Sequence, residues 1–172
     1  RVTGVQTCAL PISRTASRTG APAGPEEIVV TAGGQMALHY ALAACLDPGE
    51  AAVIVDPFYA TYPGTIRAVE GVVRTAPALP DAGFQPDLAA LDRACAGARV
   101  LMINTPHNPT GAVYSPETIE AVAEIATRRG LWLISDEVYD GMAWRGRHLS
   151  PRGLPGMAER TVVIGSLSKS HA

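Results

Sequence analysis

The order of short apolar runs and longer helical segments is the feature that most constrains this chain. Apolar runs with the length of buried strands occur at residues 28–31, 52–55, 71–75, 100–104, 131–134 and 161–164. Segments of helical composition lie between most of them, at residues 35–46, 59–69, 87–95 and 115–129. Strands that alternate with helices of roughly ten to fifteen residues are typical of βαβ units. The sequence therefore predicts an α/β fold, with a mainly parallel, mixed sheet flanked by helices.

Composition excludes several classes of protein. Charged residues make up 17% and hydrophobic residues 47% of the chain, which is not the composition of a disordered polyelectrolyte. The formal net charge of -2 offers no basic footprint for nucleic acid. No apolar run approaches the roughly 18 residues that a membrane span needs. Three cysteines do not make a disulfide framework, and they fit a reducing, cytoplasmic compartment. We therefore expect neither a nucleic-acid nor a membrane partner.

The two ends of the chain do not look like those of a natural protein. Residues 2–12 read VTGVQTCALPI, which is also the translation of a common sequencing-library adapter, and the first residue is Arg1. We interpret residues 1–13 as adapter-derived and exclude them from the prediction of the fold. The alternative is a genuine but irregular N-terminal segment. Because the chain stops shortly after a Ser-Lys pair, we expect residues 14–172 to be an internal piece of a longer protein.

Four junctions between a strand and the next segment carry residues that can do chemistry. In open α/β sheets, ligands bind at the carboxyl ends of the strands. The first junction reads Gly33-Gly34-Gln35 and leads into a helix. Small residues there let backbone N–H groups approach an anion, which the helix dipole also attracts. A tight turn explains these residues equally well, because the motif is neither GxxxxGK[ST] nor GxGxxG.

The second and third junctions each place a polar side chain at the end of an apolar strand. Residues 105–111 read TPHNPTG, and the two prolines leave Asn108 little freedom, which suits a fixed hydrogen-bond donor. A rigid turn is the alternative. Residues 135–139 read SDEVY, and a carboxylate at Asp136 in an apolar sheet must be paired. One helical turn would aim Asp136 and Tyr139 at the same ligand.

The fourth junction contains Lys169, which is the only lysine in the chain. It follows the apolar run at residues 161–164 and lies among hydroxyl groups in the segment SLSKS. A single lysine at the end of a strand is a candidate nucleophile for a Schiff base. A solvated surface lysine is the alternative when this junction is considered alone.

Together and in this order, the segments TAGGQ, DPFYATY, NTPHNPTG, SDEVYD and SLSKS resemble the class I/II aminotransferases of PLP fold type I. The resemblance covers residues 20–172. It implies a PLP-dependent transaminase that moves an amino group from an amino acid to a 2-oxo acid, as a cytoplasmic homodimer. It also implies that residues 14–172 are a partial PLP-binding large domain that lacks the N-terminal arm and the C-terminal small domain. The chain alone is therefore expected to be inactive.

The same resemblance implies a role for each site residue. Lys169 would form the Schiff base with pyridoxal 5'-phosphate and then move the proton, and Asp136 would pair with the pyridine nitrogen. Tyr139 and Asn108 would donate hydrogen bonds to the ring 3-oxygen, and Tyr59 would stack on the ring. The catalytic residues would be Lys169, Asp136 and Tyr139, with no metal. The phosphate would be held by Gly33, Gly34, Gln35, Ser166 and Ser168.

Two alternatives share parts of this pattern. A PLP-dependent lyase or synthase of the same fold type, such as a carbon–sulfur lyase or an aminocyclopropane-carboxylate synthase, would use the same Schiff base. An aminotransferase-like sensor domain of a winged-helix transcription regulator would share the fold, although such domains usually depart from NPTG and DExY.

The segments SPRGLPGMAERT and SLSKSHA are similar to pyruvate-linked transaminases of basic amino acids. The amino donor itself cannot be read from the sequence.

Overall fold

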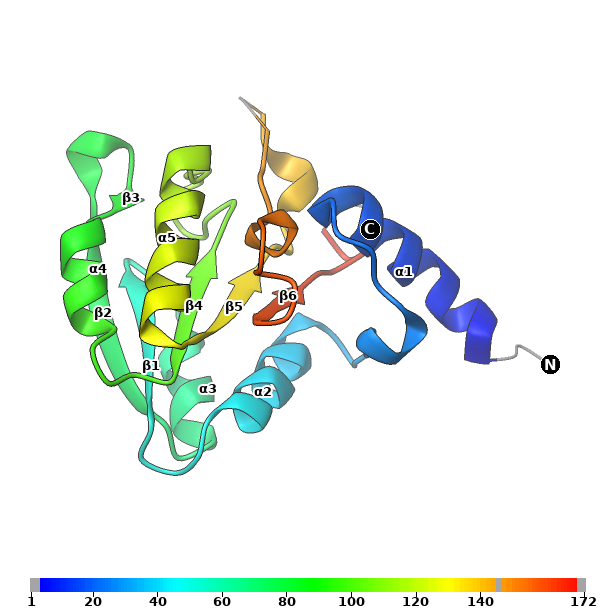
Figure 1. The fold of residues 1–172 in the computed structure, drawn as a ribbon, viewed down its shortest axis with the longest axis horizontal. Coiled ribbons are helices and arrows are strands. Elements are labelled where there is room, and N and C mark those ends of the chain that lie inside the picture. Colours follow the sequence, from blue (N-terminus) through cyan, green and yellow to red (C-terminus); the bar gives the residue numbers. More distant parts are fainter. Residues whose placement is uncertain (1–3, 145–146, 170–172) are drawn as a thin grey trace.

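A mostly parallel sheet runs through the structure between two layers of helices (Figure 1). The structure is a computed structural model that describes residues 4–144 and 147–169. Within this part of the chain the sheet has six strands in the order β3-β2-β1-β4-β5-β6. All neighbours pair in parallel except β2 and β3, which are antiparallel. The strands are β1 (Ala51–Asp56), β2 (Val72–Leu79), β3 (Gln85–Pro86), β4 (Val100–Asn104), β5 (Trp132–Asp136) and β6 (Thr161–Ile164). The predicted mainly parallel, mixed sheet is confirmed.

Four of the helices correspond to the predicted ones. The α-helices are α1 (Gly4–Thr19), α2 (Gly34–Cys45), α3 (Tyr62–Ala68), α4 (Leu88–Ala94) and α5 (Pro116–Arg129). Short 3-10 turns lie at η1 (Pro25–Glu27), η2 (Pro80–Ala82), η3 (Asp140–Met142) and η4 (Pro151–Gly153). Helix α3 starts three residues later than predicted and has Pro63 in its first turn, where the missing N–H costs no helical hydrogen bond. No helix in the described ranges is long and apolar enough to cross a membrane.

Both faces of the sheet are buried, and each face has its own hydrophobic core. Alternate strand residues pack against α4 and α5 on one face, in a cluster that includes Val53, Leu101, Leu133, Leu91 and Ile119. The other set packs against α2 and α3, in a cluster that includes Ile54, Met102, Ile134, Leu42 and Ile66. Burial on both faces is why the central strands read as continuous apolar runs rather than as alternating ones.

The prediction of a strand at residues 28–31 is wrong. These residues form no strand, and in the described part of the chain no ladder hydrogen bonds join them to another segment. Val29 is 77% exposed and Val30 is 61% exposed. Their β-branched side chains favour extended backbone, but a strand also needs a partner, and composition does not supply one. Of the segment that we interpret as adapter-derived, residues 1–3 lie outside the described residues, and α1 runs through all of the rest.

Replacement of Ser115 by alanine is expected to destabilise the protein by about 1 kcal/mol. Ser115 is the N-cap of α5, and its Oγ accepts a hydrogen bond from the backbone N–H of Thr118 at 3.2 Å. The alanine variant leaves that N–H without its partner at the end of a helix that packs on the core. Chemical denaturation measures the change, and Ser115→Asp is the control because aspartate caps a helix about as well as serine. Equal stability of all three proteins would contradict the assignment of this cap.

Candidate active site

A cavity of about 230 Å³ lies at the carboxyl ends of β4, β5 and β6. Parallel strands end at one edge of a sheet, so the junctions that follow them meet there. Most of the predicted site residues line this cavity: Gly34, Gln35, Tyr59, Asn108, Asp136, Tyr139, Ser166, Ser168 and Lys169. The exception is Gly33, which lines a neighbouring, larger cavity instead. Side chains from four separate junctions and from the loop after β1 therefore surround one small space.

Asp136 is the buried charge of this cavity. It is the last residue of β5 and is only 5% exposed. The hydroxyl of Tyr62 donates a hydrogen bond to Oδ2 at 2.6 Å, and the N–H of Val138 donates one to Oδ1 at 3.3 Å. Burial raises the pKa of Asp136, and the nearby charge of Glu137 raises it further, whereas the two hydrogen bonds lower it. Both donors are neutral, so the carboxylate would be stabilised strongly by a cationic partner.

Asn104 joins two of the strand ends. It is the last residue of β4 and is 4% exposed. Its Nδ2 donates to the backbone carbonyl of Asp136 at 2.9 Å, and its Oδ1 accepts from the backbone N–H of Asn108 at 2.7 Å. One amide therefore positions both the carboxylate-bearing strand and the loop that carries Asn108. His107, in the same loop, is buried against Tyr114 and forms a hydrogen bond with Thr110, which is a structural role.

Three tyrosines and the lysine also line the cavity. Tyr59 is 40% exposed, and its ring packs edge-on to that of Tyr62, with 5.6 Å between the centroids. The Nζ of Lys169 is 5.9 Å from the centroid of the Tyr139 ring. A turn rather than the predicted helical turn follows Asp136, but it still brings Asp136 and Tyr139 to the same cavity. A primary amine, a buried carboxylate and hydroxyl donors thus face one space.

The start of α2 offers backbone N–H groups to an anion. Gly33 precedes the helix with φ 90°, a conformation that glycine adopts readily and other residues rarely do. The first N–H groups of the helix have no intrahelical partner. The side chain of Gln35 is already engaged, because Thr61 donates to its Oε1 and its Nε2 donates to Thr65. Gln35 can therefore serve an anion through its backbone N–H, because its side-chain amide is occupied.

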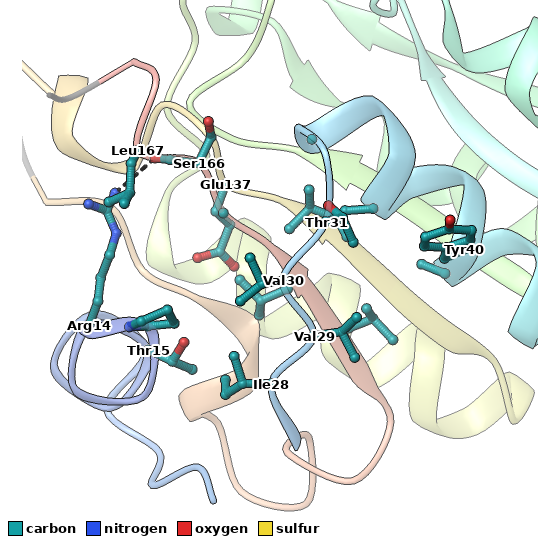
Figure 2. Close-up of a pocket in the computed structure, with 18 of the residues that line it drawn as sticks. Arg14, Thr15, Ile28, Val29, Val30, Thr31, Tyr40, Glu137, Ser166 and Leu167 are labelled. Atoms are coloured by element: carbon teal, nitrogen blue, oxygen red, sulfur yellow. Dashed lines mark hydrogen bonds between the residues drawn. The ribbon is translucent and has the colours of Figure 1, made fainter. Parts of the chain in front are cut away.

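A larger cavity of about 670 Å³ adjoins the first one (Figure 2). Figure 2 shows Arg14 and Thr15 of α1 on one side of it, and the segment from Ile28 to Thr31 with Tyr40 on the other. Its walls are mostly apolar. The carboxylate of Glu137, which also lines it, is already hydrogen-bonded by His148 at 2.9 Å and by Ser150 at 2.7 Å. The larger volume would favour this cavity as a ligand site. However, the lysine amine, the Asp136 carboxylate and the side chain of Tyr139 line the smaller cavity, which is therefore our candidate site.

Sequence reasoning missed Tyr62 and Asn104, both of which line the candidate site. Asn104 could have been noticed, because it is a polar residue at the end of the apolar run VLMIN and at the same sheet edge as Asp136. The contact of Tyr62 with Asp136 spans 74 residues and has no signal in the sequence. In the described ranges no group of His, Cys, Asp and Glu side chains could hold a metal ion.

Comparison with known proteins assigns the chain to one family. A profile of the family "Aminotransferase class I and II" matches residues 12–172. The chain is 40% identical over 158 residues to an arginine–pyruvate transaminase of Pseudomonas aeruginosa, covering 90% of this chain and 40% of that protein. It is 39% identical over 150 residues to an aspartate/prephenate aminotransferase of Thermus thermophilus, covering 86% of this chain and 38% of that protein.

A solved structure shows the same fold. The N-succinyldiaminopimelate aminotransferase of Mycobacterium tuberculosis superposes with a TM-score of 0.88 at 38% identity, over 92% of this chain and 41% of that one. The predicted large-domain fold of PLP fold type I is thus confirmed. The chain spans about 40% of the length of these relatives. Since the family profile matches nearly all of its residues, the chain belongs to the class I and II aminotransferases.

Proposed function

We propose that the full-length protein is a PLP-dependent aminotransferase that moves an amino group from an amino acid to a 2-oxo acid. One observation carries the proposal: a single cavity brings together the sole lysine of the chain, the buried carboxylate of Asp136 and the donors Asn108 and Tyr139. The curated relatives include transaminases named for arginine and for aspartate. Because these names differ in the amino donor, the substrates that we propose are those of the whole class, an amino acid and a 2-oxo acid.

The residues of the site fit pyridoxal 5'-phosphate. A protonated pyridine nitrogen would give Asp136 the cationic partner that its neutral donors do not. The free N–H groups at the start of α2, with Ser166 and Ser168, suit a phosphate dianion. The exposed ring of Tyr59 offers a stacking surface, and Lys169 offers an amine for covalent attachment. The chemistry of the donor set therefore matches each part of the cofactor.

The cofactor, when bound, supplies an electron sink for the negative charge that develops at the substrate Cα. The chain supplies the remaining functions. Lys169 Nζ would take the proton from the substrate Cα as a base and then, as an acid, deliver it to C4′ of the cofactor. Asp136 would hold a proton on the ring nitrogen, and Asn108 and Tyr139 would donate hydrogen bonds to the ring oxygen. Tyr59 would stack on the ring. Gly34 and Gln35 would bind the phosphate through their backbone N–H groups, and Gly33 would allow the turn that presents them.

We also propose that residues 14–172 are part of the cofactor-binding domain of a longer enzyme, and that residues 1–13 are foreign to it. The length of the relatives supports the first part, and the adapter-like string VTGVQTCALPI supports the second. By this proposal the chain alone is inactive. Resequencing of the gene with a different library chemistry should replace residues 1–13 by other residues. Recovery of the same string in frame would overturn the second part.

The resemblance further leads us to propose a homodimer that works in the cytoplasm, with no nucleic-acid or membrane partner. Light scattering on the full-length protein tests the oligomeric state, and a monomeric active enzyme would contradict it. Fractionation of the source cells tests the compartment. Neither result bears on the chemistry of the candidate site.

The full-length enzyme is expected to convert one equivalent of amino acid to 2-oxo acid per active site when no acceptor is present. It should turn over repeatedly once a 2-oxo acid acceptor is added, because the amino group must leave before a second amino acid can react. Mass spectrometry of both products across a panel of amino acids measures this. Release of ammonia with many turnovers in the absence of acceptor would identify the lyase alternative. Failure to bind pyridoxal 5'-phosphate would overturn the proposed function.

A further inference from the structure

Tyr62 contacts the carboxylate of Asp136 from a distant part of the chain. Tyr62 is the first residue of α3, is 3% exposed, and donates its hydroxyl to Asp136 Oδ2 at 2.6 Å. We infer that Tyr62 is a positioning residue of the proposed reaction, which keeps Asp136 ionised and aimed so that the shared proton stays on the pyridine nitrogen of the cofactor. This inference rests on the proposed function, and it assigns to Tyr62 a role that the motifs of the sequence do not indicate.

The geometry holds the carboxylate from several elements at once. The 2.6 Å distance is that of a short hydrogen bond to a charged acceptor. The N–H of Val138 reaches Oδ1, and Asn104 holds the backbone carbonyl of Asp136. Each carboxylate oxygen can accept two hydrogen bonds, so a further donor can still bind. Tyr62 therefore orients Asp136 without using up its capacity for the cofactor.

Tyr62 itself has little freedom to move. Its ring packs edge-on to Tyr59 and belongs to the hydrophobic core between the sheet and helices α2 and α3, together with Ile66. A rigid donor loses little entropy when it makes its hydrogen bond. The hydroxyl is thus presented to Asp136 by the fold, before any ligand binds.

The hydrogen bond from Tyr62 affects the protonation of Asp136. Burial raises the pKa of Asp136, while the bond from Tyr62 lowers it and so favours the charged form. Burial and the neighbouring Asp136 raise the pKa of Tyr62, so its hydroxyl remains a donor at neutral pH. Without this hydroxyl, Asp136 becomes a stronger base. A stronger base draws the shared proton from the pyridine nitrogen toward itself.

The chain offers a matched control in Tyr114. This residue is also a buried tyrosine, 1% exposed, and its hydroxyl has no hydrogen-bond partner in the structure as described. Tyr114→Phe removes the same atom from a comparable environment, without any loss of a contact to Asp136. The comparison of the two variants separates the hydrogen bond from the loss of a buried hydroxyl.

The test measures the protonation of the cofactor in the full-length enzyme without substrate. Wild type, Tyr62→Phe and Tyr114→Phe are loaded with pyridoxal 5'-phosphate labelled with ¹⁵N in the ring, and the ¹⁵N chemical shift is recorded. We expect Tyr62→Phe to move the shift toward the unprotonated value and to weaken cofactor binding about tenfold, as for loss of a hydrogen bond to a charged group. Tyr114→Phe should match wild type in both measurements.

A second variant keeps the test decisive if Tyr62→Phe folds poorly. Incorporation of 3-fluorotyrosine at position 62 makes the hydroxyl a stronger donor with almost no change in shape. It should move the ¹⁵N shift the opposite way, toward the protonated value. An unchanged shift in the Tyr62 variants, together with normal cofactor binding, would overturn the role of Tyr62 and leave the proposed function intact. Lack of cofactor binding by wild type would instead overturn the proposed function, and this inference with it.

Discussion

Replacement of Asp136 by asparagine in the full-length enzyme is expected to slow proton transfer from the substrate by about 10²- to 10⁴-fold, with the cofactor still bound. The ring can accept electrons well only while its nitrogen is protonated, and a buried carboxylate favours that charged form. Asparagine keeps the shape and a hydrogen bond but removes the charge. The expected loss corresponds to roughly 3 to 5 kcal/mol of barrier. Single-turnover kinetics with a range of amino acids measures the effect.

Two controls accompany this variant. Asp136→Glu should do less damage, because the charge survives even though the reach changes. Thermal unfolding of the cofactor-free protein should show that Asp136→Asn is at least as stable as wild type at pH 7. Burial raises the pKa of Asp136 in the folded state, so folding at pH 7 is penalised by that charge, and the neutral asparagine removes the penalty. Rates near those of wild type in the asparagine variant would mean that Asp136 is structural.

Replacement of Lys169 by alanine is expected to abolish covalent attachment of the cofactor and to reduce activity by 10⁴-fold or more. A positioned general base alone contributes about 10²- to 10⁴-fold, and Lys169 is proposed to serve also as the point of attachment. The variant should still bind pyridoxal 5'-phosphate without a covalent bond, through the start of α2, Asp136 and Tyr59. Borohydride reduction of the wild-type enzyme, followed by peptide mass spectrometry, should place the phosphopyridoxyl group on Lys169.

The position of the label makes this test specific. Residue 169 is the only lysine of this sequence, so a labelled peptide from this region has one possible site of attachment. Lys169→Arg serves as the control, because arginine keeps the positive charge but does not attach to the cofactor. A label on a lysine elsewhere in the full-length protein, or full activity of either variant, would show that the site has been assigned wrongly.

The central strands and the longest predicted helix could be read from the sequence because their causes are local. The runs that became β4 and β5 are apolar at nearly every position, as burial on both faces requires. Helix α5 carries its own start and stop signals, with Ser115 as its N-cap and Gly130 in the left-handed conformation at its end. Such features depend on neighbours within a few residues along the chain.

Strand pairing could not be read in the same way. Residues 28–31 have the composition of a strand but lack a partner in the described part of the chain, whereas β2 extends to Leu79, well beyond its predicted end. That extension pairs with β1 and β3, and the register is set by those neighbours. Local composition measures the preference of a segment for extended backbone, while the hydrogen bonds of a sheet depend on what lies beside it.

Some features of the candidate site could likewise be predicted from the sequence, and others could not. The sequence shows that Asp136, Asn108 and Lys169 follow apolar runs, and parallel strands bring such ends to one edge of a sheet. With the family resemblance, this was enough to predict that the three residues lie close together. The hydrogen bond from Tyr62 to Asp136 and the bonds of the Gln35 amide to Thr61 and Thr65 were not predictable in this way. These contacts arise from the way α2 and α3 pack on the sheet. Their distances are set by the packing of whole helices, which no spacing along the chain encodes.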